Sequence, residues 1–374
     1  MAMMIREGYK RLGDYIEPVD ERNSTLSVKL SQGICNNKYF ITPRQVAENS
    51  ANDKIVRKGQ FAYNRATTRN GDKISIAYRE GEDCTVSSAY QVFRIIDENK
   101  LNPHYLWMWF RRPEFDRYAR FKSRGSAHEF FEWDEMCDVY LPVPDIDVQR
   151  RIVAEYQAVE DRIKSNNDLV VQLEETSVSL YNEMLSRECS AKDVKEVHSS
   201  LLLSDVADII MGQSPEGESL NENGDGNVFY QGRTDFGFRF PSIRMYTNSP
   251  TKMARKGDVL LSVRAPVGDL NIATCDCCIG RGIASLRSKL GCNSYLYYLL
   301  KSLHDVFKVS DGDGTIFGSI SKEELFSIKV AYPGDSLVKE FETKAKVIDK
   351  AIQSFEAETE QLNTLRALLL AKLS

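Results

Sequence analysis

Two long stretches of the chain place apolar residues at alternating spacings of four and three positions, and neither stretch contains Pro or Gly. The first set of positions is Ile152, Tyr156, Val159, Ile163, Asn166, Val170, Leu173, Ser177, Leu180 and Met184. The second set is Phe341, Ala345, Ile348, Ile352, Phe355, Thr359, Leu362, Arg366, Leu369 and Leu373. This alternation is the a/d stripe of a heptad repeat, so both stretches are predicted to be long helices that pair as a coiled coil.

Both helices are long for a small domain, because about five heptads at about 1.5 Å per residue give a length of about 50 Å. A stripe that packs only on its own globular domain would show the same pattern, and this alternative stays open. Four polar residues interrupt the seam: Asn166, Ser177, Thr359 and Arg366. Polar seam residues either fix the register of the two helices or mark where a third helix from a partner packs.

The rest of the chain consists of two similar copies, whose matched segments occur in the same order and at similar spacing. The matched segments are 12–14 with 203–205, 58–60 with 256–258, 84–94 with 277–287, 105–106 with 295–296, 124–126 with 313–315, and Pro144 with Pro333. The runs 84–94 and 277–287 are apolar and rich in β-branched residues, which predicts a strand in each copy. The repeat is far longer than the roughly 20 to 50 residues of solenoid or propeller repeats. We therefore expect a domain at 1–146, a helix at 147–188, a second domain at 199–335 and a second helix at 336–374.

Composition is compatible with two domains of ordinary size, since the chain has 374 residues and 42% of them are hydrophobic. No apolar run approaches the length that crosses a bilayer, and the start of the chain lacks the apolar core of a signal peptide, so we expect a cytoplasmic protein. The eight cysteines do not form the two C-x-x-C pairs of a zinc cage, and we expect reduced, buried thiols and no metal.

A basic run interrupts an acidic chain. The net charge is −5, which argues against indiscriminate polyanion binding but leaves room for a local patch. Residues 111–124 interleave the cations Arg111, Arg112, Arg117, Arg120, Lys122 and Arg124 with Phe115, Tyr118 and Phe121. Cations neutralise phosphates, while planar and forked groups contact bases, so this run is typical of nucleic-acid binding. A solvated helix face would give a similar run.

A second basic cluster surrounds a polar loop at 64–71, directly after the strand-like residues 60–63. Its members are Arg57, Lys58, Arg65, Arg69 and Lys73. Side chains of a loop that follows a strand project from the end of a sheet. The corresponding loop of the second copy holds Ser262, Arg264 and Gly268, with Gln231, Arg233 and Arg239 upstream. Because the second copy is less basic, it would depend more on hydrogen bonding than on charge if both copies read nucleic acid.

Catalytic motifs are missing from the sequence. It has no G-x-x-x-x-G-K-[ST] phosphate loop, no G-x-S-x-G elbow, no H-E-x-x-H pair and no Asn- or Asp-Pro-Pro-aromatic segment of an adenine methyltransferase. Residues 311–314 lack most ligands of a calcium loop and are predicted to form a turn. The acidic residues at 144–147 lie at a helix entrance, where carboxylates complement the helix dipole. We expect a chain without chemistry of its own.

Over nearly its whole length the chain resembles the specificity subunits of Type I restriction-modification enzymes. The resemblance depends on the order domain, long helix, domain, long helix, and on local signatures in the same order. These signatures are the segments 211–215 (MGQSP), 256–268 (KGDVLLSVRAPVG), 141–144 (LPVP) and 149–152 (QRRI). The chain departs from the pattern at 17–19, where the first domain lacks Gly-x-Ser-Pro, and at Val338-Lys339, which replaces Glu-Gln. The first departure suggests another target-recognition subtype, and the second puts partner contacts there in doubt.

The resemblance implies two target-recognition domains of mixed α/β character and an antiparallel helix pair that acts as a spacer. Each domain would read one half of a bipartite, asymmetric double-stranded DNA site. Two modification subunits would carry the methyl donor and the methyltransferase chemistry, and restriction subunits would complete the nuclease. The chain itself would need no cofactor and catalyse nothing. Two alternatives stay open: a coiled-coil scaffold whose domains bind proteins or small ligands, and a nucleic-acid enzyme with an unrecognised motif.

Candidate DNA-contacting residues follow from side-chain chemistry. Arg and Gln can meet guanine or adenine with two hydrogen bonds, whereas Lys more often holds phosphate. The candidates are Arg65, Thr68, Arg69, Arg120, Lys122, Arg124, Ser126 and His128 in the first domain, and Gln231, Arg233, Arg264, Arg281 and Thr315 in the second. An internal salt bridge would equally account for Arg281. The aromatic group Phe130, Phe131 and Trp133 fits base stacking or partner binding, but core packing is the commoner fate of such residues.

Overall fold

The computed structural model describes residues 8–43, 50–67, 73–124, 129–191, 200–309 and 318–373. The chain divides into two compact units, one made of Met1–Lys164 with Glu360–Ser374 and the other of Ser165–Thr359. Each unit therefore combines a strand-rich part with segments of two long helices, α4 (Ile146–Ala191) and α9 (Asp335–Ala371). Among the described helices, none is both long enough and apolar enough to cross a membrane.

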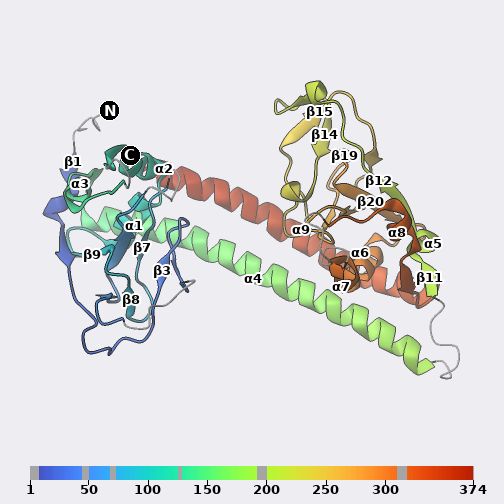
Figure 1. Ribbon diagram of the computed structural model, residues 1–374, viewed down its shortest axis with the longest axis horizontal. Coiled ribbons are helices and arrows are strands. Elements are labelled where there is room, and N and C mark those ends of the chain that lie inside the picture. The colour runs from blue at the N-terminus through green and yellow to red at the C-terminus, as the bar shows by residue number, and fades with distance from the viewer. Residues whose placement is uncertain are drawn as a thin grey trace. The chain divides into compact units, whose positions relative to one another are not determined.

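The strand-rich part of the first unit contains short strands and short helices (Figure 1). In order these are β1 (Tyr9–Arg11), η1 (Leu12–Asp14), β2 (Ile16–Val19), β3 (Gly33–Ile34), β4 (Phe40–Ile41), β5 (Lys54–Val56), β6 (Phe61–Asn64), β7 (Ile76–Tyr78), β8 (Cys84–Val86), β9 (Tyr90–Ile95), α1 (Pro103–Phe110), α2 (Pro113–Lys122), α3 (Trp133–Cys137) and β10 (Tyr140–Pro142). Its largest sheet has the antiparallel order β2-β9-β6-β7, with the separate pairs β5-β8, β3-β4 and β1-β10.

The second unit repeats this plan with an insertion. Its elements are β11 (Ser200–Leu202), α5 (Leu203–Val206), β12 (Ala207–Met211), η2 (Gly217–Ser219), β13 (Leu220–Asn221), β14 (Asn227–Tyr230), η3 (Arg233–Asp235), β15 (Met245–Thr247), β16 (Met253–Ala254), β17 (Val259–Ser262), β18 (Leu270–Ile272), β19 (Cys277–Ile279), β20 (Ile283–Ser288), α6 (Asn293–Ser302), α7 (His304–Val309), α8 (Lys322–Ser327) and β21 (Lys329–Ala331). The sheet order β12-β20-β17-β18 matches β2-β9-β6-β7, and β11-β21 matches β1-β10.

The insertion extends the second unit's other sheet, because β14, β15 and β13 join the pair β16-β19 that corresponds to β5-β8. Strand β14 pairs with β19 in parallel, whereas its other neighbour, β15, is antiparallel. The duplication in the sequence is thus a duplication of strand topology, and the mixed α/β fold is confirmed. The runs 84–94 and 277–287 each form two strands joined by a turn rather than one strand.

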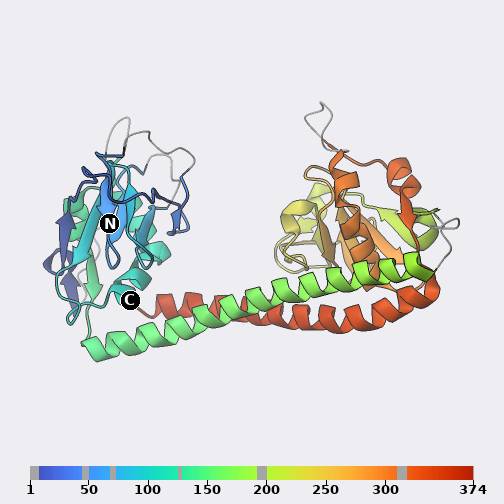
Figure 2. The ribbon, with the colours of Figure 1, turned by 90° about the horizontal axis from the view of Figure 1, so that it is seen from below.

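The long helices α4 and α9 pack against each other within each unit (Figure 2). The seam follows the predicted heptads. Every seam position named above is buried or partly buried. In the second unit the Nδ2 of Asn166 donates to Glu358 Oε2 at 3.1 Å and lies 3.4 Å from Thr359 Oγ1. In the first unit Arg366 Nη1 lies 3.1 Å from Glu160 Oε1. Early α4 therefore meets late α9, so the helices are antiparallel, and these polar seam residues bond across the seam as a register role requires.

The first unit has an aromatic core between its main sheet and α1. Phe61 of β6 stacks on Phe93 of β9 with ring centroids 5.1 Å apart, and Phe110 of α1 meets Phe61 edge-on at 5.8 Å. Tyr156 of α4 and Leu373 join the same buried cluster. Aromatic pairs at such distances add about 0.5–1.5 kcal/mol each beyond the burial of their area. The strand-rich part is thereby attached to the helix pair of its own unit.

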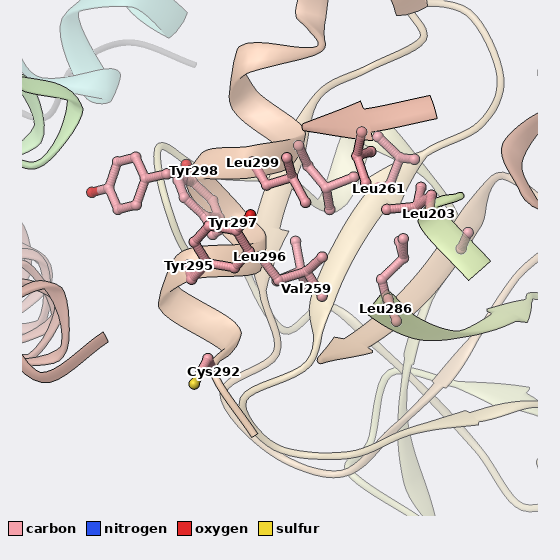
Figure 3. Close-up of a cluster of buried hydrophobic side chains, with 14 of the residues drawn as sticks. Leu203, Val259, Leu261, Leu286, Cys292, Tyr295, Leu296, Tyr297, Tyr298 and Leu299 are labelled. Atoms are coloured by element: carbon pink, nitrogen blue, oxygen red, sulfur yellow. The ribbon is translucent and has the colours of Figure 1, made fainter. Parts of the chain in front are cut away.

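In the second unit, α6 covers the sheet that contains β17. Figure 3 shows Leu296 and Leu299 of α6 facing Val259 and Leu261 of β17. Phe341 of α9 packs edge-on against Tyr298 at 5.7 Å and against Tyr181 of α4 at 5.7 Å. Fully burying an aliphatic or aromatic side chain contributes about 1.5–3 kcal/mol, so this layer supplies much of the unit's stability.

Candidate nucleic-acid interface

Strand ends from the second unit's two larger sheets meet around the turn at residues 280–282, which joins β19 of one sheet to β20 of the other, and this place is called the strand-end edge below. The amide of Gly280 donates to Tyr230 O at the end of β14, at 2.8 Å. The amide of Val263, just after β17, donates to Gly282 O at 3.0 Å. The segment after β12 reaches the same place, because Gln213 N donates to Ile279 O at 2.9 Å. Side chains from four separate segments can therefore act on one ligand here.

Glycines allow this close approach. A Cβ on Gly212 would lie 2.2 Å from Gly280 O and 2.7 Å from Ile283 O, distances that no side chain can occupy. A Cβ on Gly280 or Gly282 would lie 2.9 or 3.0 Å from Gln231 O. The hydroxyl of Ser214 accepts from the amide of Arg281, at 3.4 Å. The segment 211–215 thus has a structural purpose, which is to hold the turn that carries Arg281.

The four described candidates of the second copy all lie at this edge and are exposed. Gln231 directly follows β14, Arg264 follows β17, and Arg281 is the middle residue of the turn. The side chain of Arg233 is 47% exposed and its Nε donates to Asp269. Within the described part of the chain, no ion pair involves Arg264 or Arg281, so the internal salt bridge considered for Arg281 is not formed there. Both side chains are exposed.

A buried carboxylate shapes the loop that carries Gln231 and Arg233. Asp235 is 3% exposed, and its Oδ2 accepts from the amides of Gln231 at 2.7 Å and Gly232 at 3.3 Å. Its Oδ1 accepts from Arg244 Nε at 3.0 Å. A carboxylate that binds several N–H groups holds a loop in one conformation. Asp235 therefore presets the backbone from which Gln231 and Arg233 project.

The first unit has an equivalent edge at the end of β6. There Arg65 Nε donates to Ala89 O, in the turn between β8 and β9, at 3.3 Å. Its Nη1 lies 3.3 Å from Glu132 Oε2, and the side chain is 39% exposed. Arg65 therefore occupies the place in the first copy that the Arg264 loop occupies in the second. Five of the predicted candidates, Thr68, Arg69, Ser126, His128 and Thr315, lie outside the described residues, as does the predicted turn at 311–314.

The basic run of the first domain is largely paired with the domain's own carboxylates. Arg120 binds Glu129, Lys122 Nζ lies 2.7 Å from Glu135 Oε2, and Arg124 lies 3.5 Å from Glu135 Oε1. Arg124 remains 82% exposed, whereas the side chain of Lys122 is 27% exposed. Arg124 is thus the member of this run that is most accessible to a ligand. The run is not a patch of free cations.

Two of the three aromatic residues near 130, Phe131 and Trp133, belong to the core, as core packing predicts, whereas Phe130 is partly buried outside it. Phe131 is fully buried and meets Tyr63, Phe115 and Tyr118 edge-on, with centroids 6.0–6.3 Å apart. Trp133 packs on Phe93 at 5.7 Å. Phe121 of α2, by contrast, is 61% exposed. Among the described residues, no group of three or more His, Cys, Asp or Glu side chains is placed to hold a metal ion.

Comparison with known proteins identifies relatives of this chain. Residues 200–367 match the family model described as the Type I restriction modification DNA specificity domain. The chain is 29% identical, over 287 residues, to a protein of Methanocaldococcus jannaschii that is named as the specificity subunit of the type I restriction enzyme MjaX. This alignment covers 71% of the chain and 66% of that relative, so the chain spans about two thirds of the relative's length. The resemblance to Type I specificity subunits is confirmed.

Comparison with solved structures also gives Type I specificity subunits. The S subunit of a Type I restriction-modification system from M. genitalium superposes with a TM-score of 0.63 at 13% identity, covering 99% of this chain and 98% of that one. The HsdS subunit from Thermoanaerobacter tengcongensis is 25% identical, with a TM-score of 0.40, and covers 100% of this chain and 99% of that chain. The similarity to the M. genitalium subunit shows a shared fold. The match to the specificity-domain model covers the second copy and most of α9.

One cation that lies upstream of the second copy's polar loop is buried in the interior of its unit. Arg239 follows Gln231 and Arg233 in the sequence, but its side chain is 0% exposed and binds Glu174 of α4 and Asp349 of α9. The partners lie 65 and 110 positions away in sequence, so no local pattern could have revealed them. Ser262 of the polar loop itself is also fully buried; it donates to Pro266 O at 2.8 Å and closes the turn after β17.

The Arg239 site includes a glutamate whose charge is poorly compensated. Burial raises the pKa of Glu356 to about 7, although the Arg239 backbone and charge oppose the shift, and Glu356 Oε2 has no hydrogen-bond partner among the described residues. Burial likewise lowers the pKa of Lys301, to about 8, and the charge of Arg239 adds to this shift. Both shifts reflect the cost of holding charges out of water beside the helix seam.

Replacing Glu356 with Gln should stabilise the protein at pH 8 and change little at pH 4.5. A folded carboxyl with a raised pKa retains its proton after the unfolded one has lost it, so its contribution to stability is full below the unfolded pKa and is lost as pH rises through about 7. We expect a gain of about 1–2 kcal/mol at pH 8, discounted for partial exposure. Urea unfolding at the two pH values measures it. The exposed Glu360→Gln is the control, and an equal effect of Glu356→Gln at both pH values would contradict the assignment.

Replacing Arg65 with Ala should weaken DNA binding by about 1–3 kcal/mol and relax base choice at one position of one half-site, if Arg65 contacts a base. Filter binding and the methylation pattern measure the two effects. Glu132→Gln is the matched control, because it removes the ion-pair partner but leaves Arg65 in place. Equal losses in both variants would assign Arg65 a structural role, and unchanged affinity and pattern in Arg65→Ala would remove it from the interface.

Proposed function

We propose that this chain is the DNA sequence-specificity subunit of a Type I restriction-modification complex. Its two target-recognition domains, residues 1–146 and 199–335, each bind one half of a bipartite, asymmetric site. The helices at 147–188 and 336–374 form the spacer between them. The chain addresses other subunits to the site and has no catalytic activity of its own.

The observation that carries the proposal is the convergent edge of the second copy. Gln231, Arg264 and Arg281 project from three strand ends around one turn, and the two arginines have no ion-pair partner among the described residues. A bidentate Arg recognises guanine O6 and N7, and a bidentate Gln recognises adenine N6 and N7, each pair giving about 1–3 kcal/mol of discrimination. A ligand that presents base edges beside phosphates fits this set better than a small apolar molecule.

Duplication of the edge supports a divided target. Arg65 and Arg124 lie at the first copy's edge, so one chain carries two similar readers, one before α4 in the sequence and one after it. Readers on one face of a duplex must lie close to a whole turn apart, which is about 34 Å. A helix pair of about 50 Å is long enough to set such a separation. The partners of the proposed complex are double-stranded DNA, two modification subunits that carry the methyl donor, and restriction subunits, in the cytoplasm.

Salt-dependent binding to duplex DNA tests this function. The purified chain in complex with modification subunits should bind random duplex weakly, and raising salt from about 50 to about 200 mM should weaken binding by on the order of a thousandfold if about six phosphates are neutralised. Salt-independent binding, or none, would favour the scaffold alternative, in which the domains hold proteins or small ligands. The chain alone should neither cleave nor methylate DNA, and activity of the chain alone would overturn the non-catalytic assignment.

A further inference from the structure

In each unit, one arginine of the strand-rich part reaches a glutamate of α4 beside the helix seam. We propose that these arginines, Arg111 and Arg239, are positioning residues that fix the orientation of each target-recognition domain on its own segment of the helix pair. This inference rests on the proposed function, because it assigns the two residues to half-site spacing rather than to base contact. Neither residue touches the strand-end edges described above.

Arg239 contacts three helices through the two Nη atoms of its guanidinium. Its guanidinium binds Glu174 of α4 and Asp349 of α9, and Nη2 donates to Tyr298 Oη of α6 at 2.6 Å. The same group lies 4.4 Å from the ring centre of Tyr297. Glu174 also binds Lys301 and accepts from Tyr298 Oη at 3.2 Å. A forked, planar cation between two carboxylates on two helices has only one good geometry.

Arg239 is close in sequence to the reading residues. It lies in the loop 231–244, in which Gln231 and Arg233 reach the strand-end edge and Asp235 binds the loop backbone. The amide of Gly237 donates to Phe240 O at 3.2 Å, so Arg239 sits in a tight turn. The carbonyl of Arg239 accepts from Ile272 N of β18, at 2.9 Å. One short loop therefore connects the readers to the helix pair.

Arg111 also binds a glutamate of α4, in the first unit; by the matched segments its counterpart in the second copy is Lys301, which binds Glu174 alongside Arg239. Arg111 caps the C-terminus of α1, and its Nη1 lies 3.4 Å from Glu160 Oε1 of α4. Glu160 also binds Arg366 of α9, at 3.1 Å. The guanidinium of Arg111 lies 5.6–5.9 Å from three aromatic ring centres, those of Tyr39, Trp107 and Tyr156. Its side chain is 14% exposed, so it belongs to the interior rather than to the basic run in which its sequence places it.

The two glutamates occupy the same heptad position. Glu160 follows the seam residue Val159 and Glu174 follows the seam residue Leu173, so they lie two heptads apart on one helix. Such flanking positions usually pair with the partner helix of a coiled coil and set its orientation. Here they accept an arginine from a target-recognition domain as well. The repeat of one contact at equivalent positions points to a common purpose in both copies.

The preference for one spacer length between the half-sites distinguishes a positioning role from base contact or from a role in stability alone. The test uses complexes of the full chain with modification subunits on a DNA library that keeps both half-sites and varies the spacer by single base pairs. Arg239→Lys keeps the charge and loses the fork, and Arg239→Met and Arg111→Met remove the charge. We expect each variant to lose about tenfold in preference for the wild-type spacer over spacers one base pair longer or shorter, with base choice inside the half-sites unchanged.

The controls decide between the remaining outcomes. Arg187→Ala removes an exposed arginine that joins α4 to Glu340 of α9 at 3.2 Å without touching a strand-rich part, and it should keep wild-type spacing. If Arg239→Met does not fold, Arg239→Lys and Arg111→Met decide the question. Unchanged spacing in folded variants would overturn the positioning role, as would relaxed base choice in one half-site. A wild-type complex that methylates no library member would instead overturn the proposed function.

Discussion

Replacing Gly212 with Ala should cost the second unit about 1–3 kcal/mol of unfolding free energy, or more, because the new Cβ has no space. It would lie 2.2 Å from Gly280 O, 2.7 Å from Ile283 O and 2.8 Å from Ile279 O, and all three atoms are backbone. Relief requires the end of β12 to move away from the turn that carries Arg281. We therefore expect loss of second half-site recognition together with the loss of stability. Urea unfolding and methylation of a known site measure the two effects.

Gly217 provides the matched control for this substitution. A Cβ there meets nothing within 4 Å, and the residue lies in the same segment of the chain, in η2. Gly217→Ala should leave stability within about 0.5 kcal/mol of wild type, as surface substitutions usually do. If Gly212→Ala behaved like Gly217→Ala, the close contact between β12 and the β19–β20 turn would be wrong.

Removing residues 163–169 of α4 together with residues 356–362 of α9 should shift the preferred half-site spacing. The two segments face each other, because Asn166 bonds to Glu358 and Thr359. One heptad at about 1.5 Å per residue shortens the spacer by about 10 Å, which equals about three base pairs at about 3.4 Å each. We expect methylation of the original site to be lost and sites about three base pairs closer to be preferred. Methylation of a spacer library measures the shift.

The paired deletion leaves the other helix contacts in place. Glu160 keeps Arg366, and Glu174 keeps Arg239, so both domains retain their attachments to the helices. Deleting the heptad from α4 alone is the control, since it breaks the register and should lower stability instead of resetting the spacing. An unchanged spacing preference after the paired deletion would contradict the spacer role of the helices.

Much of the architecture was predictable because it depends on periodic patterns. The heptad positions, from Ile152 to Leu373, give the helix seam, and the duplicated segments give two sheets of the same strand order. The runs 84–94 and 277–287 were predicted as single strands. Each instead contains a turn, and in the second copy the glycines at 280 and 282 could have revealed it. The insertion that adds β13, β14 and β15 to one sheet left no comparable signal.

Only part of the candidate site could be predicted from the sequence, namely the residues whose exposure follows from their position directly after a strand. Arg264 and Arg281 project from strand ends, and loops at strand ends are where a sheet exposes its side chains. The ion pairs could not be predicted, since they depend on which side chains the fold brings together. Arg120 and Lys122 pair with glutamates 9 and 13 residues further on, and Arg239 pairs with residues of two distant helices. The sequence shows which residues are charged, but it does not show which residues pair with them.

Sequencing of methylated adenine in cellular DNA tests the central claim, which is that the two copies read different halves of one site. Cells would hold the modification subunits with the wild-type chain, with Arg65→Ala, with Arg281→Ala, or without the chain. We expect one bipartite motif with the wild-type chain and no such motif without it. Each substitution should relax base choice in a different half of that motif. A motif that persists without the chain, or two substitutions that alter the same half, would contradict the account.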